Sequence, residues 1–477
     1  MPIVEFAALK LKMHIKTLQL SWTRINSFIQ EKQLSFASLL LLLLSGTLQF
    51  ISSLSHAIAL RKLLLLIAFL IAFRYFWEAL QKKPKPLLSA VLIFVLLQVW
   101  MLVIAGAISN QPLASFSEWK GQWLPAFMSF VVGIGLARTL TLSKLKAPRV
   151  VVVMSILVPI TIYLCINAIV IVHDWMLAGR FLPSLGGLGD HHGVSGYLVA
   201  LLEPILIVDL LSRLVKGNRL LPVPSWVISA ILIFAVCTLI ATTNRNGILI
   251  TLLTFILVTA MMIPEIRKAY SPKKFITFVL ATLVFALAIA LVSYKTDPRW
   301  QNFIETVPIA WDIDRDLLWL NGDGTNFPLT PGGEQADISE YSRIAWAHEG
   351  WRMLMAHPWG MEIARDTFHK LELAKYGHAG MAHSHNSWID FGLEVGIPGL
   401  LLWGWILLLL AQFGWRTWHM HKEPLGLALA VLVIMFAIRG LLDSIFRDHE
   451  IEQFMLVAGL LFSTLSFGKN NIPQARL

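Results

Sequence analysis

Apolar runs of about 20 residues recur along most of the chain, and they restrict its fold more than any other feature. A run of that length spans the hydrocarbon core of a bilayer as one helix. The composition agrees, because 56% of the 477 residues are hydrophobic and only 14% are charged, against about 25% charged in a soluble domain. We therefore predict an all-α polytopic membrane protein, a bundle of about 12 transmembrane helices in contact with membrane lipids.

The runs divide the chain into five parts. Residues 1–33 form a basic N-terminal segment, residues 34–294 hold spans 1–9, residues 295–387 form one large loop, residues 388–467 hold spans 10–12, and residues 468–477 form a short tail. The predicted spans are 34–54, 60–77, 87–108, 123–140, 150–172, 194–214, 226–241, 247–263, 275–294, 388–413, 425–438 and 451–467.

The basic residues predict the orientation of these spans. Lys and Arg in and beside the loops on the side of both termini number 24, against 7 for the short loops on the other side and 8 in the long loop. Cytoplasmic loops are enriched in Lys and Arg, so both termini are expected in the cytoplasm and the long loop in the periplasm. The net charge of +10 is spread over these short clusters, and we expect no nucleic-acid partner.

The long loop exceeds the length of a passive connection and is expected to contain helices. Within residues 339–360, Ile344, Ala347, Trp351 and Leu354 recur at spacings of three and four, which predicts an amphipathic helix. Ser339 is its expected N-cap. Of the helix's Arg343, His348 and Arg352, one is expected to face the mouth of the membrane bundle.

Three histidines, His378, His383 and His385, precede the tenth span, and Asn386 follows them. A histidine there can accept a proton at neutral pH, because its ordinary pKa is about 6.5. The alternatives are that these histidines are interfacial loop residues, or that His383 and His385 bind zinc. No cysteine and no clear third ligand accompany them, so we expect no metal and no cofactor.

The order His385, Asn386, nine residues, Gly396, two residues, Gly399 resembles the H-[NSQ]-x9-G-x2-[GTY] motif of the membrane O-antigen ligase and polymerase family. The late long loop and the predicted topology are similar to that family as well. The resemblance implies a metal-independent, inverting glycosyltransferase of the GT-C type in the bacterial inner membrane, with a periplasmic active site. Its lipopolysaccharide ligase members move a glycan from undecaprenyl pyrophosphate to the lipid A-core oligosaccharide.

The resemblance also implies two arginines, one at the outer end of a mid-chain helix in an R-x3-L context and one in the long loop. Arg245 with Leu249 and Arg343 match these positions, and His385 matches the catalytic histidine. An arginine fork suits phosphate oxygens, and a helix that begins at Arg245 would direct its positive end at the same anion. The other expected substrate contacts are Arg180, His191, His192, Arg352, His383, Asn386 and Arg439.

Other functions remain open at this stage. A polymerase of the family is disfavoured because the eleventh residue after Arg180 is His191 and the eleventh after Arg343 is Leu354, so neither begins an R-x10-G motif. A protein O-oligosaccharyltransferase commonly has more sequence after the last span. A lipid or glycan transporter would need polar residues at the membrane midplane, where Glu203 and Asp209 are the main candidates. The DxD motif at Asp312 to Asp314 is read as a solvated loop, because nucleotide sugars are cytoplasmic.

The charge pattern predicts the outcome of reporter fusions. A reporter fused near Asp323 should be active only outside the cytoplasm, and one fused after Lys146 only inside it. Measured activities of the opposite sign would contradict the predicted orientation of every span.

Overall fold

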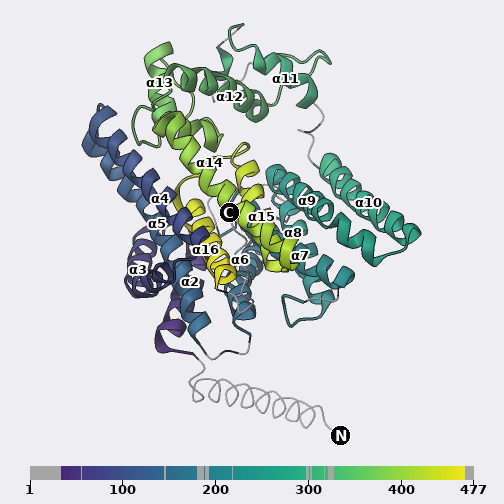
Figure 1. Cartoon of the computed structure of the whole chain (residues 1–477). Coiled ribbons are helices and arrows are strands. Elements are labelled where there is room, and N and C mark those ends of the chain that lie inside the picture. The colour runs from purple at the N-terminus through teal and green to yellow at the C-terminus, as the bar shows by residue number, and fades with distance from the viewer. Residues whose placement is uncertain are drawn as a thin grey trace.

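The structure is a computed structural model that describes residues 34–54, 56–143, 145, 147–179, 187–188, 193–216, 219–296, 300, 303–315, 317–320 and 327–467. Its regular structure in these ranges is helical, and the one strand-like contact described is an isolated bridge between Leu329 and Gln335. The prediction of an all-α helical membrane protein is confirmed. Figure 1 shows a bundle of helices with α11, α12 and α13 at one end.

Every predicted span lies on a helix. The helices are α2 (Phe36–Ile51), α3 (Ile58–Gln81), α4 (Lys85–Val103) with the π-helical turn η1 (Ile104–Ile108), α5 (Pro112–Leu142), α6 (Pro148–Ala178), α7 (Gly193–Lys216), α8 (Ser225–Ala241), α9 (Arg245–Ala269), α10 (Pro272–Thr296), α14 (Ser387–His421), α15 (Pro424–Arg439) and α16 (Asp448–Ser466). The long loop contains α11 (Phe303–Trp311), the 3₁₀ turn η3 (Leu318–Leu320), α12 (Ile338–Ala356) and α13 (Thr367–Tyr376).

Seven helices in the described ranges are long and apolar enough to cross a membrane: α3, α4 with η1, α5, α6, α9, α10 and α14. The helices α2, α8 and α15 are apolar but shorter. Helix α7 carries Glu203, Asp209 and Arg213, and α16 begins with three acidic residues in its first five. The total of twelve crossings therefore stays a prediction.

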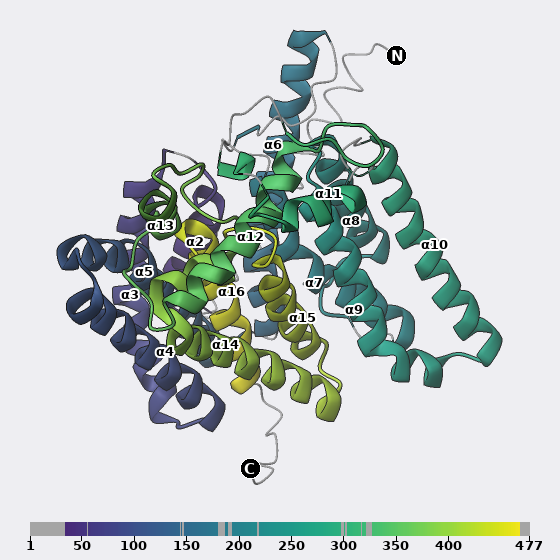
Figure 2. The ribbon, with the colours of Figure 1, turned by 90° about the horizontal axis from the view of Figure 1, so that it is seen from above.

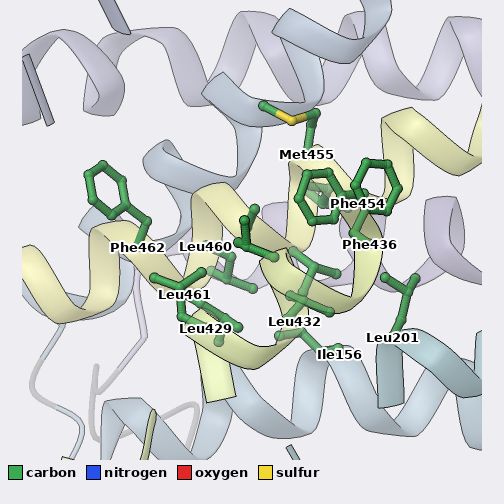
Figure 3. Packing of buried hydrophobic residues seen from close by; sticks show 14 of the residues in the cluster. Ile156, Leu201, Leu429, Leu432, Phe436, Phe454, Met455, Leu460, Leu461 and Phe462 are labelled. Atoms are coloured by element: carbon green, nitrogen blue, oxygen red, sulfur yellow. The ribbon is translucent and has the colours of Figure 1, made fainter. Parts of the chain in front are cut away.

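Helices α15 and α16 form the centre of the bundle, where nearly every side chain is buried (Figure 3). The rings of Phe436 and Phe454 stack between them, with centroids 3.6 Å apart. Close contact between helices is the main packing force in lipid, because lipid tails are as apolar as leucine. Helices α5 and α16 can pack this closely because glycine has no side chain. A Cβ added to Gly133 would lie 2.4 Å from the Leu456 carbonyl oxygen.

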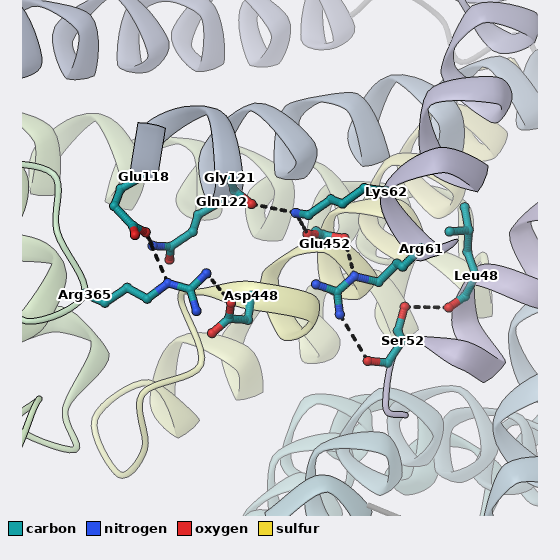
Figure 4. A network of polar contacts seen from close by, with 10 residues as sticks. All are labelled: Leu48, Ser52, Arg61, Lys62, Glu118, Gly121, Gln122, Arg365, Asp448 and Glu452. Carbon is teal, nitrogen blue, oxygen red and sulfur yellow. Dashed lines mark hydrogen bonds and ion pairs between the residues drawn. The ribbon is translucent and has the colours of Figure 1, made fainter. Parts of the chain in front are cut away.

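The helices α11, α12 and α13 lie over one end of the bundle, and Figure 2 shows α12 above the bundle beside the start of α14. Polar contacts attach this covering segment to the spans (Figure 4). Arg365 Nε lies 3.2 Å from a Glu118 carboxylate oxygen on α5, and its Nη2 lies 2.7 Å from Asp448 at the start of α16. The long loop is therefore an ordered cover where the structure describes it.

The helix predicted in the loop exists as α12, but its cap and its buried face differ from the prediction. Asp337 is the N-cap, and its side chain accepts a hydrogen bond from the Glu340 amide at 3.1 Å, so the assignment of Ser339 was wrong. Of the four predicted apolar positions, Leu354 is buried, while Trp351 is 55% exposed. The apolar pattern misled because the buried face also carries acidic residues with cationic partners, such as Glu349 with Lys375.

Helix α14 contains a sharp kink at Gly396, where φ is 67° and ψ is −177°. The turn that follows α12 fits into this kink. Ile397 donates its amide to the Pro358 carbonyl at 2.8 Å, and Met361 donates to the Leu393 carbonyl at 3.0 Å. A Cβ on Gly396 would lie 2.3 Å from the Trp359 carbonyl carbon. The first glycine of the motif is therefore required by a positive φ and by direct contact between two backbones.

Replacement of Gly396 by alanine should destabilise the protein, because both the positive φ and the backbone contact oppose a side chain. A side chain in this positive-φ conformation alone costs about 1–3 kcal/mol, and the displaced turn adds to this. Gly404 is the matched control, since it lies in the same helix and a Cβ there meets nothing within 4 Å. The measurement is the apparent Tm in detergent. Equal Tm values for Gly396→Ala and Gly404→Ala would contradict the assigned role of the kink.

Candidate functional site

Four segments meet beneath the covering helices. They are the histidine loop (residues 383–386), the loop between α15 and α16 (residues 440–447, the α15–α16 loop), the start of α9, and one face of α12. The amide of Ser387, directly after the histidine loop, donates to the Gly440 carbonyl at 2.7 Å and so joins the first two segments. The Asn246 side-chain amide donates to the Leu442 carbonyl at 3.2 Å, which attaches the start of α9 to the same place.

His383 and His385 lie against each other, with ring centroids 4.3 Å apart. On its other side His385 stacks on the indole of Trp346 from α12, with centroids 5.6 Å apart and an interplanar angle of 22°. The Trp346 indole N–H donates to the Trp319 carbonyl at 3.2 Å, which fixes this stacking surface. The backbone of His385 has a φ of 57°, a conformation that non-glycine residues rarely adopt.

Both imidazoles are neutral at physiological pH. Burial, followed by the charges of Arg343 and Arg447, lowers the pKa of His385 to about 3. Burial and Arg447 are also the largest causes that lower the pKa of His383 to about 3, and nearby Asp443 opposes them. Among the described residues, the buried Nδ1 atom of each ring has no hydrogen-bond partner. A neutral imidazole with a free nitrogen can accept a proton.

Helix α12 supplies three site residues from one face. Glu340, Arg343 and Trp346 are each three residues apart, so they project from the same side of the helix. Glu340 forms an ion pair with Arg245, and Trp346 stacks on His385. The positive charge of Arg343 lowers the pKa of both histidines. Of the three loop residues expected at the mouth, Arg343 is the one that the structure brings to His385.

Arg245 is the first residue of α9 and is largely buried, with 14% of its side chain exposed. Its guanidinium forms an ion pair with Glu340 and lies 4.0 Å from an Asp337 carboxylate oxygen. The Asn244 side chain caps the helix by accepting from the Gly247 amide at 2.7 Å. The expected arginine pair is therefore linked through α12, where Arg245 contacts Glu340 one turn before Arg343.

The site is suited to an anion. Helices α9, α14 and α16 all begin at these connected loops, so the positive ends of their dipoles lie at the site. Arg447, at the start of α16, has no hydrogen bond or ion pair from its side chain to any residue that the structure describes. The charges of Arg343 and Arg447 both lower the pKa of His385. Two cations therefore lie near one neutral base.

Other expected contacts have different surroundings. Arg439 is 2% exposed and donates to the Gly193 carbonyl at 3.3 Å, with an Asp443 carboxylate oxygen 3.7 Å away. Arg352 is bound to Asp314 of the DxD motif at 2.9 Å and lies 3.7 Å from Glu349. The Asn386 side-chain oxygen accepts from the Trp388 and Ile389 amides at 3.0 and 3.3 Å, so this residue caps α14.

Three expected site residues, Arg180, His191 and His192, lie outside the described residues. Within the described ranges, no group of three or more His, Cys, Asp or Glu side chains could hold a metal ion. His383 and His385 lie together, but no third ligand of these types joins them there.

Residues 230–404 match the family model described as O-antigen ligase. This segment of the chain is similar to the O-antigen ligase family. The matched segment holds Arg245, Arg343, His385, Gly396 and Gly399, so it includes the two arginines, the histidine and the kink described above. No curated protein matches the chain. The similarity supports a ligase or polymerase type of function in a membrane.

Sequence reasoning assigned no role to Glu340, Trp346 or Arg447. Glu340 pairs with Arg245, Trp346 stacks on His385, and the charge of Arg447 lowers the pKa of His385. Glu340 and Trp346 flank Arg343 at helical spacing, a signal that could have identified them once α12 was predicted. Arg447 lies at the end of a different loop, beyond the matched segment. Its position beside the histidines depends on how two loops meet, and no local pattern encodes that.

The lowered histidine pKa values predict how stability depends on pH. The unfolded histidines gain protons below their ordinary pKa of about 6.5, whereas the folded ones remain neutral down to about 3. Stability is therefore lost as the pH falls below 6.5, by up to about 2 kcal/mol per histidine at pH 5. The Tm of the double variant His383→Gln and His385→Gln should fall less between pH 7 and pH 5 than that of the wild type. Equal decreases would show that the imidazoles are accessible and free to charge.

Proposed function

We propose that this protein is an O-antigen ligase that transfers a glycan from undecaprenyl pyrophosphate to a sugar hydroxyl of the lipid A-core oligosaccharide. The reaction takes place on the periplasmic face of the bacterial inner membrane, with both termini in the cytoplasm, and it is of the inverting, metal-independent GT-C type. The match of residues 230–404 to the O-antigen ligase family model supports a ligase or polymerase activity. The choice of lipid A-core as acceptor is favoured by the lack of R-x10-G motifs after Arg180 and Arg343.

The proposal rests on one observation: a neutral His385, with Nδ1 unpartnered among the described residues, lies beside the cations Arg343 and Arg447. A lipid pyrophosphate that carries a sugar has two negative charges, which two arginines can balance. A sugar hydroxyl needs a base when it acts as a nucleophile. Two cations for the leaving group and a proton acceptor beside them support the proposed reaction.

The chemical step balances with these groups alone. The acceptor oxygen forms a bond to the anomeric carbon while the bond from that carbon to the pyrophosphate oxygen breaks. The electron pair of the broken bond goes to the pyrophosphate, where arginine fork donors stabilise the added charge. The hydroxyl proton goes to the His385 imidazole. A single displacement of this kind inverts the anomeric centre.

Donor binding should strengthen the base. In the empty site the charges of Arg343 and Arg447 help to lower the pKa of His385 to about 3, and so weak a base abstracts a proton poorly. A bound pyrophosphate neutralises these charges and places negative charge near the imidazole, which raises its pKa. The histidine therefore becomes an effective base only after the donor has bound. In the free enzyme its low pKa keeps it unprotonated at neutral pH.

Reconstitution tests the proposed reaction directly. Purified protein in liposomes, supplied with a glycan on undecaprenyl pyrophosphate and with lipid A-core, should form the glycan–core linkage in the presence of EDTA. The anomeric configuration of the product, measured by NMR, should be opposite to that of the donor. Transfer to a second lipid-linked glycan, with none to lipid A-core, would indicate a polymerase.

Arg343 should contribute through its fork geometry as well as its charge. Arg343→Ala should lose about 10²-fold or more in transfer rate, because a donor to the developing charge is removed. Arg343→Lys should recover only a small part of the lost rate, since an ammonium group lacks the planar fork that binds two phosphate oxygens at once. Arg74, an exposed arginine on α3 that pairs with Glu78, is the control, and Arg74→Ala should transfer normally. Full activity of Arg343→Lys would show that only charge is needed there.

A further inference from the structure

One carboxylate joins the two loops that carry the histidines and Arg447. Asp390 lies in the first turns of α14, and its Oδ1 accepts from the Ser384 amide at 2.8 Å and from the Ser384 hydroxyl at 2.7 Å. Its Oδ2 accepts from the Ser444 hydroxyl at 2.7 Å. Ser384 stands between the two histidines in the chain, and Ser444 belongs to the α15–α16 loop. The two carboxylate oxygens of Asp390 thus accept hydrogen bonds from different loops, one from the histidine loop and one from the α15–α16 loop.

A second contact reinforces this junction one turn earlier in α14. The Ser387 hydroxyl oxygen accepts from the Ile445 and Phe446 amides at 2.6 and 3.2 Å, and the hydroxyl donates to the Asp443 carbonyl at 2.6 Å. Arg447 follows directly and lines the same small cavity as Asp390 and Ser444. The position of Arg447 relative to the histidine loop is therefore determined by two side chains of α14.

An ordinary structural role in helix capping does not account for Asp390. Asn386 already satisfies the Trp388 and Ile389 amides at the start of α14. The Asp390 carboxylate points back past this cap to the loop residues, where His385 holds an unfavourable positive φ. A strained backbone persists only where its surroundings fix it, and the bonds from Ser384 provide that constraint next to His385.

We propose that Asp390 is a positioning residue, which holds the His385 imidazole and the Arg447 guanidinium in the geometry that transfer requires by joining Ser384 to Ser444. The inference rests on the proposed function, since it assigns the orientation of the base used there. Asp390 does not touch the substrate in this account. It acts through the two serines and should affect the rate of the chemical step more than donor binding.

The first test compares single variants in the reconstituted transfer assay. Asp390→Ala should lower kcat by about 10²-fold, as expected for a misplaced catalytic group, while KM for the lipid pyrophosphate donor stays near the wild-type value. Asp390→Asn should lose less, because its oxygen can still accept from Ser384. Ser444→Ala should lower kcat, whereas Ser463→Ala, which removes another buried serine hydroxyl bonded to the Ile134 carbonyl, should not.

The second test separates positioning from poor folding. If Asp390 acts through His385 and Arg447, then Asp390→Ala should cause little further loss in a background that already carries His385→Ala and Arg447→Ala. A folding defect would lower the amount of active protein by the same factor in both backgrounds, and that result would overturn the inference. Normal kcat in Asp390→Ala would overturn it too. Normal transfer by His385→Ala alone would contradict the proposed function instead, so the two failures can be told apart.

Discussion

The backbone junction between the turn after α12 and the kink in α14 determines how the rest of the site is assembled. Gly396 and Gly360 both have positive φ, and a Cβ on either would collide with the backbone of the other segment. Amide hydrogen bonds on both sides of the kink complete this contact. Helix α12 carries Arg343 and Trp346, and α14 begins two residues after His385. The close fit between the turn after α12 and the kink near the start of α14 therefore fixes α12 relative to α14, and with it the distance between arginine, indole and imidazole.

Electrostatics then determines what this arrangement can do. Two histidines are kept neutral by burial and by the cations Arg343 and Arg447, so the site contains positive charge and a free base at the same time. These are opposite requirements, because positive charge weakens a nearby base. A dianionic donor resolves them, since it binds the cations and in doing so strengthens the base. On this view the order of events, donor first and proton transfer second, follows from the charges of the empty site.

Much of the fold could be predicted because membrane helices obey strong local rules. Each predicted span lies on a helix, and Gly396 is required for a reason that the motif alone did not reveal. The buried face of α12 was predicted incorrectly, because Glu340 and Glu349 are buried with cationic partners that lie elsewhere in the chain. The substrate contact expected of Asn386 stays a prediction, and its side-chain oxygen also caps α14. The error on α12 arises because the partners of its buried carboxylates are set by tertiary contacts, which periodicity does not report.

The central claim is that His385 removes the proton of the acceptor hydroxyl. A direct measurement uses purified His385→Ala and His383→Ala proteins in single-turnover transfer, with binding of the lipid pyrophosphate donor measured separately. The account predicts that His385→Ala binds donor normally but loses about 10² to 10⁴ in rate, the usual contribution of a general base. His383→Ala should lose much less. Transfer by His385→Ala at close to the wild-type rate would show that the histidine is a structural loop residue and would contradict the mechanism.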